Sequence, residues 1–237
     1  MRNYFCFNGA RSIDKGLTVE HCPNFGSGQR VVEKITVPGR SGDLLIDNAT
    51  YGNCTQSYDI WFKDRQRGTM RAASDISQWL LSAVGYKRLE DSYDPDVFRM
   101  ALFAGPFDVT NWMLTHGRAI ITFDCKPQRY FKQGEFPVLV KSGQKISNQW
   151  MPALPIIQIS GTGDGQLMVG NSQVDITDMT GAITLDCDGQ NAYDGTLNLN
   201  NNITITGGWP VLETGQTAIS FSGGITAVEI TPRWWTL

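Results

Sequence analysis

The sequence predicts a mainly β protein with a single α-helix, divided into two domains. Three observations support this fold class. Apolar and polar residues alternate with a period of two along most of the chain, as expected for half-buried strands. Turns rich in Gly, Asn, Asp and Pro separate these runs. One stretch, residues 69–84, instead spaces its apolar residues as an amphipathic helix does.

Length and composition limit the functions that the chain can have. It has 237 residues, enough for one large core or two ordinary ones, and a net charge of −3. This charge gives no general reason to bind nucleic acid or an anionic membrane. No apolar run reaches the roughly 18 residues that span a bilayer, and the first residues do not resemble a secretory signal. The five cysteines include no C-x-x-C pair, which favours reduced thiols in a protein made in the cytoplasm.

The first half is predicted to form a β domain, residues 1–132, of sandwich or barrel-like type with the helix inserted. Its expected strands include Arg30–Val37, Tyr58–Phe62, Val97–Phe103 and Arg118–Cys125. Thr69 lies near the expected start of the helix and Gly85 just after its expected end. The predicted apolar stripe of the helix consists of Met70, Ala73, Ile76, Leu80, Ala83 and Val84.

The second half, residues 133–237, is predicted to be an antiparallel β-sandwich. Short runs follow one another with turns such as GTGDG, TGA and SGG between them. The expected strands are Val138–Val140, Leu167–Val169, Val174–Ile176, Ile183–Leu185, Leu197–Leu199, Ile203–Ile205, Ile219–Phe221 and Ile225–Ile230. Pro, Gly and polar residues in KPQRYFKQGEFP place the domain boundary near residue 132.

An acidic cluster in the segment ITLDCDGQNAYDG is a candidate calcium or catalytic site. Asp186, Asp188 and Asp194 surround Gly189. When Asp186 is taken as position 1 of a calcium loop, position 6 is Asn191 instead of Gly, and position 12 is Leu197 instead of Glu. The flanking residues also have the pattern of strands. We therefore predict a polar turn, and the sequence predicts no catalytic residue, no metal site and no cofactor.

Two other features are candidate contact sites. The stretch VPGRSGDLL carries G-x-x-G beside Arg40 but lacks the GK[ST] of a phosphate loop, so we expect a tight connection with positive φ at Gly39 and Gly42, and Arg40 paired with a carboxylate. Exposed tryptophan can stack on sugars or fill subunit contacts. Trp209, Trp234 and Trp235 are the candidates. Because adjacent strand residues point to opposite faces, we expect Trp234 or Trp235 to leave the core unless both faces are covered.

Read in order, several segments resemble the distal tail proteins of long, flexible-tailed bacteriophages (siphophages). The resemblance covers nearly the whole chain and depends on the order and spacing of the segments. The segments are Phe7–Pro23, Val37–Asn53, Tyr58–Phe62, Gln78–Leu81, Phe123–Tyr130, Pro155–Asn171, Ile183–Tyr193, Trp209–Gly223 and Ile225–Trp235.

This resemblance implies a structural protein of the virion, assembled in the host bacterial cytoplasm and located at the tail tip. The N-terminal domain would close into a homo-hexameric ring, and the C-terminal domain would be a galectin-like sandwich. Such a hub joins the tail tube to a tail-associated fibre or lysin protein, often with receptor-binding proteins, and DNA leaves through its lumen. The chain has no room for the long insertion with which some members hold receptor-binding proteins.

Two other classes remain as alternatives. A carbohydrate-binding module would hold cell-wall saccharide on the C-terminal sandwich through an exposed aromatic residue such as Trp209. A cell-wall hydrolase would need paired acids, with Asp188 as the candidate. Solution mass, glycan binding and activity on purified cell wall distinguish these classes from the tail hub.

Overall fold

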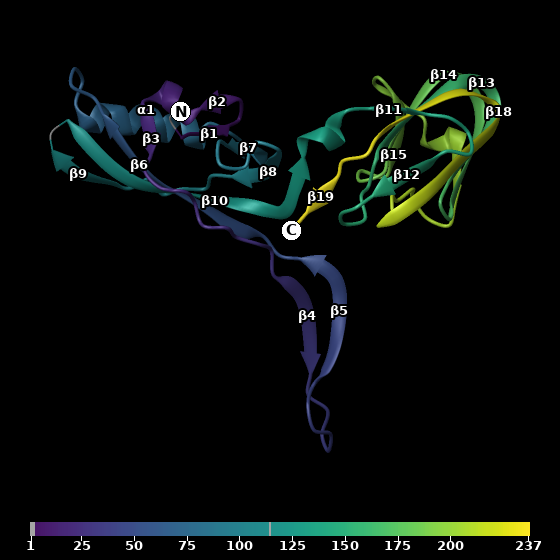
Figure 1. Cartoon of the computed structure of the whole chain (residues 1–237), viewed down its shortest axis with the longest axis horizontal. Coiled ribbons are helices and arrows are strands. Elements are labelled where there is room, and N and C mark those ends of the chain that lie inside the picture. The colour runs from purple at the N-terminus through teal and green to yellow at the C-terminus, as the bar shows by residue number, and fades with distance from the viewer. Residues whose placement is uncertain (1–2, 114) are drawn as a thin grey trace. The chain divides into compact units, whose positions relative to one another are not determined.

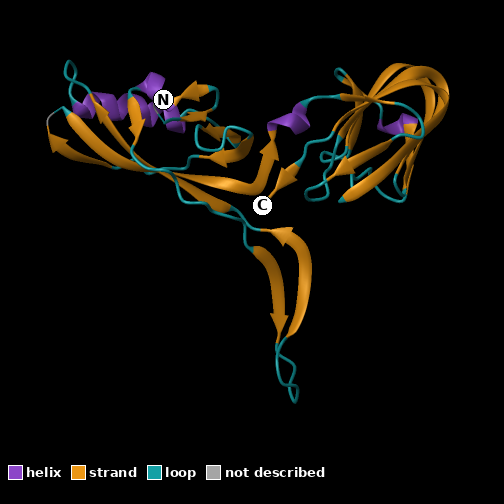
Figure 2. Cartoon of the chain, viewed as in Figure 1, coloured by secondary structure: helices purple, strands orange, loops and turns teal. Residues whose placement is uncertain are grey.

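The structure is a computed structural model that describes residues 3–113 and 115–237, and it divides into two compact units. Unit 1 extends to Arg129 and includes Leu237, and unit 2 comprises Tyr130–Thr236. Composition alone placed this division near residue 132. Each unit has its own hydrophobic core. Among the described residues there is one α-helix, and the remaining regular structure is strand with short 3-10 helices, so the predicted fold class is confirmed (Figures 1 and 2).

Unit 1 is built on an antiparallel sheet in the order β2-β1-β7-β8-β10-β6-β3, with β9 also paired to β10. The strands with the greatest length in this sheet, β6 and β10, pair over ten positions from His116↔Lys63 to Cys125↔Cys54. The bounds are β1 Phe5–Phe7, β2 Ala10–Arg11, β3 Leu17–Val19, β6 Cys54–Lys63, β7 Lys87–Asp91, β8 Val97–Leu102, β9 Val109–Met113 and β10 His116–Phe131, with the 3-10 helix η1 at Ser12–Lys15.

One face of this sheet carries an aromatic core. Phe5 stacks on Tyr58 with ring centroids 4.7 Å apart, and Phe7 lies 4.9 Å from Phe123. All four rings are buried. Along β6, every second residue shares the core face with Tyr58, and the residues in between point to the opposite face. This accounts for the strict alternation of buried and exposed positions in that strand.

Helix α1, Thr69–Leu81, covers this core through Ala72, Ile76 and Leu80. It is shorter than the predicted 69–84, because Ser82 is already the C-cap and Gly85 lies beyond it. The predicted stripe is also partly wrong, since Met70 is 73% exposed and Val84 is 85% exposed. The buried positions repeat every four residues, and this places Met70 on the solvent side of the helix.

Unit 2 is a β-sandwich whose two layers share three strands. In one layer the order is β11-β18-β13-β14-β15-β16, and in the other β12 pairs with β18 and β17 with β14. The bounds are β11 Val138–Val140, β12 Lys145–Asn148, β13 Ile156–Val169, β14 Ser172–Asp186, β15 Asn191–Asp194, β16 Leu197–Asn198, β17 Ile203–Thr206, β18 Gly215–Thr231 and β19 Trp235–Thr236, with 3-10 helices η2 Lys132–Glu135 and η3 Asn200–Asn202.

The register shows how the three shared strands turn from one layer to the other. The first half of β13 pairs with the second halves of β14 and β18, and its second half pairs with their first halves. The ladders shift register between Gly161 and Gly165. Apolar residues from both halves, such as Ile159 and Leu167, are fully buried in the same core. Each of these strands therefore contributes to both layers (Figure 1).

Glycine allows this bend because the backbones of β13 and β18 nearly touch. A Cβ on Gly224 would lie 1.8 Å from the Thr162 carbonyl oxygen, and a Cβ on Gly161 would lie 2.1 Å from the Gly224 carbonyl oxygen. Gly163 and Gly223 adopt positive φ beside this crossing.

The prediction of separate short strands was therefore wrong at three places. GTGDG lies inside β13, TGA inside β14, and SGG inside β18. In each case the glycine bends a continuous strand instead of ending it. Val174–Ile176 and Ile183–Leu185 thus belong to one strand, as do Ile219–Phe221 and Ile225–Ile230.

Substituting Gly224 with Ala should destabilise unit 2, because the new Cβ would clash with backbone that cannot rotate away. We expect the free energy of unfolding to fall by about 2–4 kcal/mol. Thermal and denaturant unfolding of the full chain measure this loss. Gly189→Ala is the matched control, since its Cβ would meet only side-chain atoms of Asp186, the nearest at 3.3 Å, and no backbone atom. Equal stability of the two variants would contradict the proposed role of the crossing.

Candidate assembly interface

The most exposed regular structure in unit 1 is a two-stranded ribbon formed by β4, Arg30–Ile35, and β5, Leu44–Tyr51 (Figure 1). We call this ribbon the arm. Every residue of β4 and all but the last of β5 are exposed. A two-stranded hairpin alone is at best marginally stable in water. The arm therefore has the character of an element that is completed by contact with another surface.

The register gives the arm one apolar face. Ile35 pairs with Leu44, Glu33 with Ile46, and Val31 with Thr50, so these side chains share a face. The four aliphatic residues of this face are Val31, Ile35, Leu44 and Ile46, which are 41%, 38%, 40% and 42% exposed. Glu33 and Thr50 share this face, so it is mainly aliphatic with one carboxylate, and exposed apolar side chains gathered in this way mark an interaction site.

The opposite face of the arm is held by polar contacts. Arg30 Nη1 donates to Asp47 Oδ2 at 2.8 Å, and Arg30 Nη2 donates to Tyr51 Oη at 3.3 Å. The Arg30 guanidinium also lies 5.7 Å from the centre of the Tyr51 ring. A bulge between Val31 and Val32 adds twist at this point, with Ala49 at φ 53°. This face also carries Leu45, which is 61% exposed.

The tip of the arm is the predicted tight connection. The Arg40 amide donates to the Val37 carbonyl at 3.2 Å, and Gly39 has φ 80°, as a type II turn with Pro38 at its second position requires. Gly42 also has positive φ, so both glycine predictions are confirmed. The expected ion pair of Arg40 was wrong: within the described residues its exposed side chain contacts no carboxylate. Asp43 instead accepts a hydrogen bond from Thr36 at 3.0 Å.

At the base of the arm, the incoming and outgoing chains pass in close contact with β10. A Cβ on Gly28 would lie 2.5 Å from the Pro127 Cβ and 2.7 Å from the Gly52 carbonyl oxygen, and a Cβ on Gly26 would lie 2.9 Å from the Thr55 carbonyl oxygen. The Gly52 amide also donates to the Gln29 carbonyl at 2.8 Å. These contacts set the direction in which the arm leaves unit 1.

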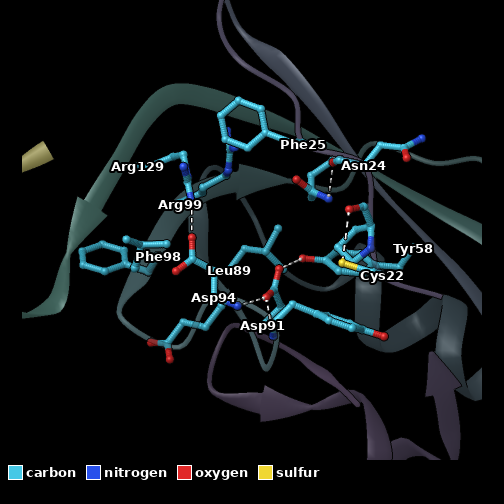
Figure 3. Close-up of a pocket in the computed structure, with 15 residues that line it drawn as sticks. Cys22, Asn24, Phe25, Tyr58, Leu89, Asp91, Asp94, Phe98, Arg99 and Arg129 are labelled. Carbon is cyan, nitrogen blue, oxygen red and sulfur yellow. Dashed lines mark hydrogen bonds and ion pairs between the residues drawn. The ribbon is translucent and has the colours of Figure 1, made fainter. Parts of the chain in front are cut away.

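A pocket of about 210 Å³ lies beside this base, between the segment that leads into the arm and strands β7 and β8 (Figure 3). Two pairs of its polar side chains are engaged with each other. Tyr58 Oη donates to Asp91 Oδ2 at 3.0 Å, and Arg129 forms an ion pair with Asp94. Burial raises the pKa of Tyr58, and the Asp91 carboxylate raises it further. Tyr58 is therefore a structural hydrogen-bond donor here.

The outward face of the unit 1 sheet, opposite the aromatic core, exposes a second apolar surface. Ile120 is 60% exposed and Trp61 is 37% exposed, on the neighbouring strands β10 and β6. Charged residues border it, and Arg118 Nε lies 2.9 Å from Glu20 Oε1. We call this surface the outer patch. It lies on a different part of unit 1 from the arm. A head-to-tail contact between two copies requires two such separate surfaces on each subunit.

In unit 2 the acidic cluster is a hairpin turn, as predicted. Asp186 ends β14, and its Oδ1 accepts hydrogen bonds from the amides of Asp188 and Gly189 at 3.3 and 3.4 Å. The same oxygen accepts from Arg233 Nη1 at 2.7 Å. Leu185 before it is fully buried, and Asp194 ends the next strand. The Asp186 carboxylate thus fastens the turn to the chain near the end of unit 2.

The candidate tryptophans lie against the core of unit 2. Trp209 is half-buried, and its carbonyl accepts from Ser172 Oγ at 3.4 Å. Trp234 is only 8% exposed, and Trp235 packs against the same core while its Nε1 donates to the Pro152 carbonyl at 2.9 Å. The expected divergence of Trp234 and Trp235 was wrong. Arg233 has φ 57° and Trp234 precedes β19, so strand alternation does not apply to this pair.

The arm's apolar face was not identified from the sequence, although the information was present. Leu44, Leu45 and Ile46 are consecutive apolar residues in a strand. Because neighbouring strand residues point to opposite faces, apolar side chains lie on both faces, and at least one of these faces lies outside a core. The alternation in Arg30–Val37 predicted a strand of the N-terminal domain but not which of its faces is exposed. Only the register shows that four aliphatic side chains gather on one side.

An antiparallel sheet covered by one helix, followed by a sandwich of bent strands, is an architecture found in a phage tail hub protein. The structure is similar over 100% of both chains to that of SPP1 Dit (gp 19.1), with a TM-score of 0.73 and 14% sequence identity. That protein is described as a paradigm of the hub adsorption apparatus in phages that infect Gram-positive bacteria. No protein-family model and no curated protein matches the chain. The likeness establishes the fold and confirms the fold expected from the sequence resemblance.

Substituting Gly28 with Ala tests the base of the arm. The new Cβ would press on Pro127 and on the Gly52 carbonyl, so we expect the free energy of unfolding of unit 1 to fall by about 1–3 kcal/mol. Denaturant unfolding followed by tryptophan fluorescence measures the change. Gly52→Ala is the control, because its nearest neighbour is the Gln29 carbonyl oxygen at 3.8 Å, and it should change the stability by no more than about 0.5 kcal/mol. If Gly28→Ala changes the stability as little as Gly52→Ala does, the close contact of Gly28 with Pro127 and Gly52 does not constrain the base of the arm.

Proposed function

We propose that this chain is a structural, non-enzymatic subunit of a phage tail tip, where it assembles into a ring that acts as the distal tail hub. The observation that carries the proposal is the arm with its exposed apolar face. The full-length likeness to SPP1 Dit supports the class of protein, and the segments that resemble siphophage distal tail proteins support the same class. Six copies is the number that this resemblance implies.

In this proposal the arm of one subunit packs its apolar face on the outer patch of the next subunit. Val31, Ile35, Leu44 and Ile46 would contact Ile120 and Trp61, and both surfaces would leave water. The two surfaces differ, so each subunit presents an arm to one neighbour and an outer patch to the other. Such a contact closes into a ring when the rotation between neighbours divides a full turn without a rise along the axis.

The ring would join the tail tube protein on one side to the tail-associated fibre or lysin protein on the other. DNA would pass through its lumen without specific binding, for which a net charge of −3 is suitable because no excess of positive charge would hold the phosphates. Unit 2 would be a galectin-like domain. The protein would act in the virion after assembly in the host cytoplasm.

A charge on the apolar face of the arm should weaken self-association. We expect Ile46→Glu to raise the dissociation constant of the assembly by about tenfold or more, because the contact would bury an unpaired carboxylate. Leu45→Glu is the matched control, since it adds the same charge at the adjacent position on the opposite face. Sedimentation velocity over a range of concentrations measures both variants.

Three outcomes decide the proposal. Weakened assembly in Ile46→Glu but not in Leu45→Glu supports docking through the apolar face, and loss of assembly in Ile120→Glu supports the outer patch as the acceptor. If both arm variants assemble as the native chain does, the arm is not the interface. A chain that stays monomeric, and whose binding to a glycan array disappears in Trp209→Ala, would favour the carbohydrate-binding alternative instead.

A further inference from the structure

Two buried cysteines face each other across the central strand pair of unit 1. Cys54 opens β6 and Cys125 lies within β10, and the two are direct partners at the end of the antiparallel ladder. Both side chains belong to the buried core face, with Cys54 8% exposed and Cys125 fully buried. Directly opposed residues on antiparallel strands have Cα atoms about 4.5 or 5.5 Å apart, which lies within the range of about 4.4 to 6.8 Å that a disulfide spans.

A buried guanidinium lies against one of the two sulfurs. Arg99, on β8, is only 8% exposed; its Nη1 donates to Cys54 Sγ at 3.0 Å and its Nη2 to the Gly26 carbonyl at 2.7 Å. Within the described residues it forms no ion pair with a carboxylate, an uncommon arrangement for a buried charge. The positive charge thus lies beside a sulfur that would carry negative charge in thiol–disulfide exchange.

Arg99 also connects this sulfur with the pocket beside the arm, whose lining includes Arg99 but not Cys54. The Arg99 side chain lines the pocket (Figure 3), and its Nη1 contacts Cys54 Sγ. Cys125 lies deeper. Burial raises the pKa of its thiol, Arg99 lowers it and the Cys54 sulfur raises it, and the resulting pKa is about 12. This arrangement makes Cys54 the first thiol to react and Cys125 the second.

We propose that Cys54 and Cys125 are a site of oxidative modification, which closes to a cross-strand disulfide by exchange with a low-molecular-weight disulfide such as oxidised glutathione. The Cys54 thiolate attacks one sulfur of the oxidant, displaces a glutathione thiolate and forms a mixed disulfide. Cys125 then loses its proton, attacks the Cys54 sulfur and expels the second glutathione thiolate. Two protein thiols are oxidised, one glutathione disulfide is reduced, and the released thiolates take up the two protons.

The bond would link β6 to β10 at the base of the arm. Cys54 follows the end of β5 by three residues, and Cys125 is two residues before Pro127, which packs against Gly28. Reducing conditions in a bacterial cytoplasm would keep the pair open, and the disulfide would form outside the cell. The inference concerns the folded chain and does not depend on ring assembly, so each can fail without the other.

Peptide mapping of the native full-length chain tests the site directly. The reduced protein is incubated with oxidised glutathione, its remaining thiols are alkylated, and non-reduced tryptic peptides are identified by mass spectrometry. We expect peptide 41–63, which holds Cys54, to be linked to peptide 119–129, which holds Cys125. The linked form should unfold about 5–10 °C above the reduced form, because the bond closes a long loop in the unfolded chain.

The rate of closure should also depend on pH. Because the pKa of Cys125 is raised to about 12, its thiolate fraction grows about tenfold for each pH unit near neutrality. The mixed disulfide on Cys54 should therefore accumulate at pH 7, and its conversion to the linked peptides should be about tenfold faster at pH 8.

Variants separate this pair from the other thiols. Cys22→Ser removes an exposed thiol and should leave the linked peptides unchanged. Cys54→Ser should abolish them and leave Cys125 unmodified in the native protein. The proposal is overturned if the native chain shows both peptides unlinked after oxidation, if linkage occurs only after denaturation, or if Cys54 pairs with a different cysteine.

Discussion

Close backbone crossings, possible only at glycine, are the constraint on which both units depend. In unit 2 the crossing at Gly161 and Gly224 lets three long strands turn from one layer of the sandwich to the other. In unit 1 the crossing at Gly26 and Gly28 sends the chain out into the arm. A side chain at either place would force backbone segments apart, because the atoms that it meets include backbone carbonyl oxygens, of Gly224 and Thr162 in unit 2 and of Gly52 and Thr55 in unit 1. The sandwich and the arm thus have the same physical origin.

This constraint also explains which parts of the fold could be predicted from the sequence. Alternation predicted strands such as Val138–Val140 correctly, and the position-by-position failure of the calcium pattern predicted the turn after Asp186. The glycine stretches were misinterpreted as turns, because a glycine that ends a strand and one that bends it have the same local sequence. The difference depends on which strand passes nearby, and that is a property of tertiary structure. The same limit hid the arm's apolar face, which exists only once β4 and β5 are paired in register.

The arm connects the fold to the proposed role. Its two strands have no core of their own, and its polar face is already satisfied by Arg30, Asp47 and Tyr51. The other face gathers four exposed aliphatic side chains, whereas the polar face exposes Val32 and Leu45. The favourable way to bury the larger apolar face is contact with a second surface. The outer patch of another copy is a suitable surface of comparable chemistry. The proposed role as an assembling subunit therefore depends on the arm, and the fold is similar to that of SPP1 Dit.

The account depends most directly on whether purified protein forms closed rings. Negative-stain images of the full chain at tens of micromolar, together with the particle mass in solution, would show this. The account predicts ring-shaped particles with rotational symmetry and a mass close to six times the 26.3 kDa of one chain. Isolated particles with the mass of a single chain at every concentration would contradict it.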